Sequence, residues 1–195
     1  MTKIAKLIEK AQNDELDILD ILHDITKGNV SELEPFIPKL MKHKSWLIRT
    51  EILEIIGTFC LKDYTDLVKK SLEDNNFHVR SYALTAYYDL LKSKAIPRIK
   101  KYCNEKNVSV RLTALIIIFI ETENDEILER IDKIVTRKNC SYYHQYVVLN
   151  TFEDYLDVKT YPEIISLYRK MLQTIPKDYA IAKDLRKRLV ELNVI

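Results

Sequence analysis

An apolar, helix-like segment recurs along this chain at an interval of 31 residues. The segments "KSWLIRTEILEII" (44–56), "NNFHVRSYALTAY" (75–87) and "KNVSVRLTALIII" (106–118) align on Arg49, Arg80 and Arg111. Three, four and seven residues after each arginine the side chain is apolar or aromatic: Ile52, Leu53 and Ile56; Ala83, Leu84 and Tyr87; Ala114, Leu115 and Ile118. This spacing places one apolar stripe on each predicted helix. A helix pair of this size cannot bury such a stripe alone, so the recurrence predicts a stack of helical repeats.

Composition supports a helical protein. The chain of 195 residues holds only 2 glycines and 5 prolines, too few turn residues for a sheet protein. Its longest apolar run, "ALIIIFI" (114–120), is too short to cross a membrane, and charge appears too early at the N-terminus for a secretion signal. Cys60, Cys103 and Cys140 are too few and too widely spaced for a disulfide framework or a zinc site. We therefore expect free thiols and a cytoplasmic location.

Hydrophobic periodicity divides the chain into predicted helix pairs. The pairs are 2–12 with 14–27, 31–43 with the Arg49 helix to about 61, 64–74 with the Arg80 helix, 94–105 with the Arg111 helix, 124–137 with 141–156, and 160–174 with 178–192. The predicted fold is a single all-α domain, 1–195, of about six stacked antiparallel helix pairs. In it, 1–30 and 158–195 are capping pairs and 31–157 holds four repeats. Neither the helix lengths nor the pattern suits a coiled coil.

The repeated segments resemble the HEAT repeat, a family of helical repeats. The resemblance rests on a first helix that contains a proline, a short turn with an acid, and then Val-Arg followed by small and large apolar residues. "LEDNNFHVRSYAL" is the closest copy, with Asp74 six residues before Arg80, and "NEKNVSVRLTAL" has Glu105 in the acidic place. Three positions depart from the pattern: His43 replaces the first acid, and His144 and Ala182 stand in arginine places.

The resemblance implies a right-handed α-solenoid. It also implies a structural ladder in which each arginine pairs with the turn acid of its own or a neighbouring repeat, through Arg49, Asp74, Arg80, Glu105 and Arg111. Such a repeat identifies an architecture and carries no chemistry of its own.

The sequence offers no signature of an enzyme. It has no nucleotide-binding glycine motif and no G-x-S-x-G, and its four histidines do not stand at metal-ligand spacing. We expect no catalytic residue, no cofactor and no metal. The predicted function is binding.

The resemblance also implies that the second helices line a concave groove. Residues at matching distances after the arginine position of each repeated segment are expected to point into this groove. They form a predicted partner-binding strip: Glu51, Glu54, Tyr82, Thr85, Asp89 and Tyr146. This strip is acidic and bears tyrosines, which favours a protein partner over nucleic acid. The sequence leaves open whether Ile116, Ile120 and Leu149 are exposed in the groove or covered.

Small HEAT-like proteins include inhibitors that mask a toxin or effector. By that resemblance, an acidic groove would suit a basic toxin, in the manner of an immunity protein. The alternative is a nucleic-acid-binding protein or DNA base-excision glycosylase that uses the basic segment 35–111, with Asp89 beside Tyr87 and Tyr88 as candidate acid. The basic residues of this segment are expected on the convex side: Lys39, Lys42, Lys44, Lys69, Lys70, Arg98, Lys100 and Lys101. A general scaffold is the third hypothesis.

Overall fold

A computed structural model describes residues 3–11 and 14–194, and within these residues every regular element is a helix. Contacts divide the chain into two compact units, unit 1 (residues 1–98) and unit 2 (residues 99–195). Each unit is held together by packing between neighbouring helices. The prediction of an all-α fold is therefore confirmed for the described residues. None of their helices is long and apolar enough to cross a membrane.

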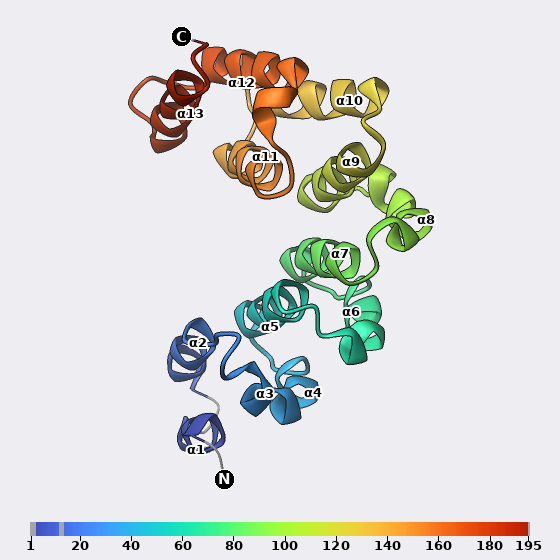
Figure 1. Ribbon diagram of the computed structural model, residues 1–195, viewed down its shortest axis with the longest axis vertical. Coiled ribbons are helices and arrows are strands. Elements are labelled where there is room, and N and C mark those ends of the chain that lie inside the picture. The colour runs from blue at the N-terminus through green and yellow to red at the C-terminus, as the bar shows by residue number, and fades with distance from the viewer. Residues whose placement is uncertain (1–2, 12–13, 195) are drawn as a thin grey trace. The chain divides into compact units, whose positions relative to one another are not determined.

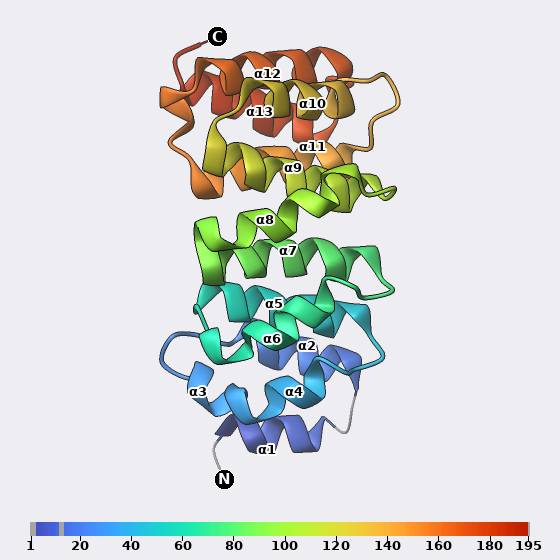
Figure 2. The ribbon, with the colours of Figure 1, turned by 90° about the vertical axis from the view of Figure 1, so that its right-hand side faces the viewer.

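Unit 1 contains two layers of helices. One layer consists of α2 (Glu15–His23), α5 (Trp46–Thr58) and α7 (Phe77–Leu91), in which α5 packs on both α2 and α7. The other layer contains α3 (Val30–Leu33), α4 (Ile37–Leu40) and α6 (Thr65–Ser71), which lie on one side of the first layer (Figures 1 and 2). The helix α1 (Lys3–Lys10) packs on α2 and α3, and α8 (Ile96–Ile99) spans the boundary between the units.

Unit 2 repeats the two-layer arrangement. Its first layer consists of α9 (Val108–Thr122), α11 (Tyr142–Tyr155) and α13 (Ala180–Glu191), in which α11 packs on both of the others. The other layer consists of α10 (Asp125–Val135) and α12 (Pro162–Thr174), as Figure 1 shows. The apolar run of the sequence forms the most buried helix, α9, in which every side chain from Leu112 to Phe119 is buried.

Polar residues define where several long helices begin. The side chains of Asn76 and Asn107 stand 31 residues apart, and each accepts a hydrogen bond from the backbone N–H two residues later, at 2.8 and 3.0 Å. Asn124 caps α10 in the same way, with its side chain 2.8 Å from the Glu126 nitrogen. Such caps satisfy backbone N–H groups that have no partner inside the helix.

The first helices of several pairs are shorter than predicted, which corrects the expected continuous segments. Residues 31–43 form α3, a 3-10 turn at Glu34–Phe36 and α4, and Pro35 and Pro38 lie at these junctions. Residues 94–105 are likewise divided among α8 and 3-10 turns at Lys92–Ala95 and Lys100–Asn104. Proline has no N–H to donate and clashes with the preceding turn, so a regular α-helix does not continue through it.

The second helix of the chain also ends earlier than predicted. It stops at His23 instead of near residue 27. Beyond it, the Asn29 side chain accepts from the Thr26 nitrogen at 2.6 Å and donates to the Asp24 carbonyl at 3.1 Å. This turn stabilised by an asparagine side chain competes with helix continuation. The predicted start of that pair, at residue 2, and residue 12 lie outside the described residues.

Candidate functional site

Five of the six predicted strip residues lie together on unit 1. Glu51 and Glu54 on α5, and Tyr82, Thr85 and Asp89 on α7, are exposed or half-buried, whereas the apolar positions between them are buried. The two helices pack side by side, so these side chains share one surface. We call this surface, together with Leu47, the unit-1 face.

The helix α2 extends the unit-1 face, which the sequence prediction missed. Its His23 Nε2 lies 3.6 Å from Glu51 Oε2. Leu16 is 71 % exposed and Asp20 is exposed on the same helix. A signal was available, because Leu16 and Asp20 stand 31 residues before Leu47 and Glu51. This spacing equals the interval that separates Arg49, Arg80 and Arg111.

Tyr82 and Leu47 are the exposed large hydrophobic side chains of α5 and α7, at 37 % and 36 % exposure. They lie among the carboxylates of Glu51, Glu54 and Asp89. A surface with a few exposed apolar anchors among acidic groups can bury those anchors against a partner and attract a partner of opposite charge.

Asp89 has a structural contact besides its place on the unit-1 face. Its Oδ1 lies 3.1 Å from Lys92 Nζ. Its Oδ2 lies over Gly57 of α5, only 3.0 Å from where a Cβ would stand, and the Ala86 Cα lies 3.2 Å from the same point. Gly57 thus allows α5 and α7 to approach closely. The neighbouring Tyr87 and Tyr88 are buried, so they offer no free ring face to a flipped base.

Tyr146, the sixth predicted strip residue, belongs to unit 2. Its hydroxyl donates to Asp184 Oδ2 at 2.9 Å and so joins α11 to α13. Burial and the bond to Asp184 raise the pKa of Tyr146. In the same unit Ile116 and Leu149 are buried and Ile120 is half-buried, so the first two are unavailable to a partner.

The three register arginines bind the turns that precede their helices. In each case Nη1 donates to the carbonyls six and five residues earlier: Arg49 to His43 (2.7 Å) and Lys44 (3.2 Å), Arg80 to Asp74 (2.8 Å) and Asn75 (3.2 Å), and Arg111 to Glu105 (2.6 Å) and Lys106 (3.3 Å). The repeated contact satisfies carbonyls that no helix pairs.

The side chains six residues before the three arginines, those of His43, Asp74 and Glu105, also make a repeated contact. Asp74 and Glu105 accept from the backbone N–H two residues later, at 2.8 and 3.4 Å. His43 departs from the acidic pattern, yet its Nδ1 accepts from the Ser45 nitrogen in the same way, at 3.1 Å. Asp74 additionally binds Arg49 of α5 through two hydrogen bonds.

A serine–histidine contact in unit 2 does not make a catalytic pair. Ser109 Oγ lies 3.0 Å from His144 Nε2 and joins α9 to α11. Ser109 is only 6 % exposed, and the buried His144 Nδ1 has no hydrogen-bond partner among the described residues. Burial, Arg137 and Arg111 lower the pKa of His144. A nucleophile needs access to substrate and a base oriented by a third group, and this pair has neither.

Basic residues of the segment 35–111 are divided between the two units. Lys39, Lys69 and Lys70 are exposed on unit 1, whereas Lys100 and Lys101 are exposed on unit 2. Arg98 lies 3.7 Å from Glu73. The remaining basic residues of the set, Lys42 and Lys44, are exposed beside the turn before α5.

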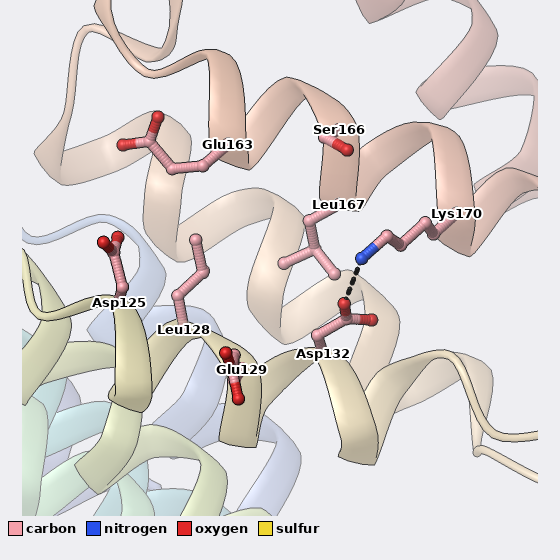
Figure 3. A pocket seen from close by; sticks show the side chains of 8 residues that line it. All are labelled: Asp125, Leu128, Glu129, Asp132, Glu163, Ser166, Leu167 and Lys170. Atoms are coloured by element: carbon pink, nitrogen blue, oxygen red, sulfur yellow. Dashed lines mark hydrogen bonds and ion pairs between the residues drawn. The ribbon is translucent and has the colours of Figure 1, made fainter.

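A groove of about 210 Å³ lies between α10 and α12 (Figure 3). Leu128 and Leu167 form its apolar part, and Lys170 pairs with Asp132 across it. Three further carboxylates line it: Asp125, Glu129 and Glu163. In the described part of the chain, no group of three or more His, Cys, Asp or Glu is arranged to hold a metal ion.

Comparison with known proteins does not assign this chain to a family. No protein-family model matches the chain, and no curated protein is similar to it.

Proposed function

We propose that this chain is a non-enzymatic binding protein of the HEAT-like kind and that it engages a basic protein partner through the unit-1 face. The proposed role is that of an inhibitor or immunity protein that masks a toxin or effector. The observation that carries the proposal is the combination, on adjacent helices, of exposed Leu47 and Tyr82 with the carboxylates of Glu51, Glu54 and Asp89.

Charge on the unit-1 face favours a basic partner. Asp20 on α2 adds a carboxylate to those of α5 and α7. The basic groups beside them include Lys92, which pairs with Asp89, and the imidazole of His23, near Glu51. The surface therefore keeps a negative excess, which speeds encounter with a positively charged protein and disfavours the phosphate backbone of a nucleic acid.

The repeat register supports the HEAT-like assignment. Three turns that stand 31 residues apart repeat the same arginine-to-carbonyl contacts, and Leu16 and Asp20 of α2 stand 31 residues before Leu47 and Glu51 of α5. Stacked repeats present consecutive second helices to one partner, so contacts spread along the stack.

The test is affinity capture of partners from the source cell with the full chain, followed by calorimetry with the purified partner. The expected partner is a basic protein. Tyr82→Ala should weaken binding by about 2 kcal/mol, roughly thirtyfold, if Tyr82 is an anchor. Tyr143→Ala is the matched control, since Tyr143 is similarly exposed (41 %) on unit 2. Equal losses in both variants, or a partner of acidic charge, would contradict the proposal.

A further inference from the structure

The edge of unit 2 where α11 and α13 begin carries exposed tyrosines. Tyr143 and Tyr179 are 41 % and 47 % exposed. Tyr142 lies against Tyr179, with ring centroids 4.4 Å apart and ring planes inclined by 48°. This contact brings the loop before α11 and the loop before α13 together. We call Tyr142, Tyr143 and Tyr179 the tyrosine edge.

Cations flank the tyrosine edge. Arg137 and Lys138 lie in the loop between α10 and α11, which runs beyond the helices in Figure 2, and Lys177 lies in the loop before α13. All three are exposed, and Asp178 is the single acidic residue of residues 136–141 and 175–179. The loops at this edge are therefore basic, in contrast to the unit-1 face.

The exposed apolar side chains of the edge are aromatic. Within the described part of unit 2, the exposed large hydrophobic residues are Tyr143, Tyr179 and Val190, and Val190 lies near the other end of α13. The unit-1 face, by comparison, exposes Leu16 and Leu47. Flat rings with cations beside them are suited to stack on bases and to contact phosphates.

We propose that the tyrosine edge binds single-stranded nucleic acid. Unpaired bases stack on Tyr143 and Tyr179, and Arg137, Lys138 and Lys177 contact the phosphates on either side. Single strands are preferred over duplex because a base inside a duplex has no free face for a tyrosine ring. This activity is additional to the protein binding proposed for unit 1 and uses a separate set of residues.

The test is fluorescence anisotropy of the full chain with a labelled oligothymidylate of about ten nucleotides, a length that suits a compact single-strand site. Binding should weaken as salt rises, with a log–log slope of about −2 for three phosphate contacts. The double variant Tyr143→Ala/Tyr179→Ala should lose about tenfold or more in affinity, and Tyr143→Phe/Tyr179→Phe should keep it. Circular dichroism of each variant establishes that the helices remain.

The matched control variants change exposed residues of unit 1. Lys69→Ala/Lys70→Ala removes two exposed cations from α6 and should leave affinity unchanged, whereas Lys138→Ala/Lys177→Ala should lower it several-fold. Tyr82→Ala should also bind as the wild type does. The proposal is overturned if no oligonucleotide binds at low salt, if duplex binds as tightly, or if the tyrosine-to-alanine variant binds normally. An acidic polyglutamate peptide that competes fully and independently of the tyrosines would indicate a protein partner instead.

Discussion

Arg49 and Asp74, which are 25 residues apart in the chain, form a two-point ion pair in unit 1. Arg49 Nε donates to Asp74 Oδ2 at 3.0 Å and Nη2 donates to Oδ1 at 2.9 Å. Only 14 % of the arginine side chain and 18 % of the aspartate side chain are exposed. The pair fixes the turn before α7 to the start of α5.

Asp74→Ala should therefore destabilise unit 1. The change leaves a mostly buried guanidinium with fewer partners and removes the acceptor for the Asn76 nitrogen. We expect a loss of about 2 kcal/mol in the free energy of unfolding. Denaturant unfolding followed by circular dichroism measures it. The neighbouring Glu73→Ala is the control and should cost less than about 0.5 kcal/mol, because Glu73 is 70 % exposed. Equal stability of the two variants would contradict the structural role.

Arg80→Ala should lower stability without changing the binding surface. It removes the donors to the Asp74 and Asn75 carbonyls, at a cost of about 1–3 kcal/mol. Partner affinity per folded molecule should stay the same, as calorimetry on the folded fraction would show. Lost binding with an unchanged melting temperature would place Arg80 in the binding site instead.

Gly57→Ala should disturb the contact between α5 and α7. A Cβ there would stand 3.0 Å from Asp89 Oδ2 and 3.2 Å from the Ala86 Cα, so these neighbours must move by a few tenths of an ångström. Overpacking costs about 1–3 kcal/mol, and the better helix propensity of alanine offsets about 1 kcal/mol of that. We expect a net loss of about 1 kcal/mol in denaturant unfolding.

Gly28→Ala is the matched control for this substitution. The nearest atom to its added Cβ, Thr26 Oγ1, is 3.7 Å away, so no clash arises. Its stability should change by less than about 0.5 kcal/mol. A larger loss at Gly28 than at Gly57 would show that the close helix contact does not matter.

Charge reversal on the unit-1 face should mainly slow association with the proposed partner. Glu51→Lys/Glu54→Lys removes the negative excess that attracts a basic protein, and stopped-flow measurements should show a lower association rate, most clearly at low salt. Glu126→Lys/Glu129→Lys makes the same charge change on α10 of unit 2 and serves as the control. If both pairs slow association equally, net charge and not the unit-1 face governs the encounter.

Stability should fall as pH decreases from about 7 to 5.5. Burial lowers the pKa of His78, and burial together with Arg137 and Arg111 lowers the pKa of His144. In the folded protein both imidazoles therefore stay neutral over part of this pH range. In the unfolded chain, where the pKa of histidine is near 6.5, the same imidazoles are already protonated there. The unfolded state then binds more protons, so stability rises with pH through this window and is lost as pH falls.

The variant His78→Phe/His144→Gln should flatten this part of the pH profile. His78 stacks on Trp46 at 4.6 Å between ring centroids, a contact that phenylalanine can keep without a titrating group. Glutamine can still hydrogen-bond Ser109 in place of His144. Denaturant unfolding at pH 7 and 5.5 compares the two proteins. An unchanged slope would assign the pH dependence to other groups.

Local sequence determined the helices and their register. Apolar residues three and four apart predicted α5, α7, α9 and α11, and the structure has a helix at each of these places. The arginine contacts to the preceding turns also follow from sequence spacing, because their partners stand only five and six residues away. Where Pro35 and Pro38 interrupt the pattern, helix length was overestimated, since periodicity alone does not record the missing N–H.

Only the tertiary structure decided which residues meet across helices. The pairing of Arg49 with Asp74 and of Tyr146 with Asp184, the placing of Asp89 over Gly57, and the burial of Ile116 and Leu149 depend on which helix packs against which. The same holds for the tyrosine edge, where Tyr142 and Tyr179 meet although 37 residues separate them. Periodicity assigns a side chain to a face of its own helix. It does not specify whether that face meets solvent or a neighbouring helix, because this depends on contacts between residues that are distant in the chain.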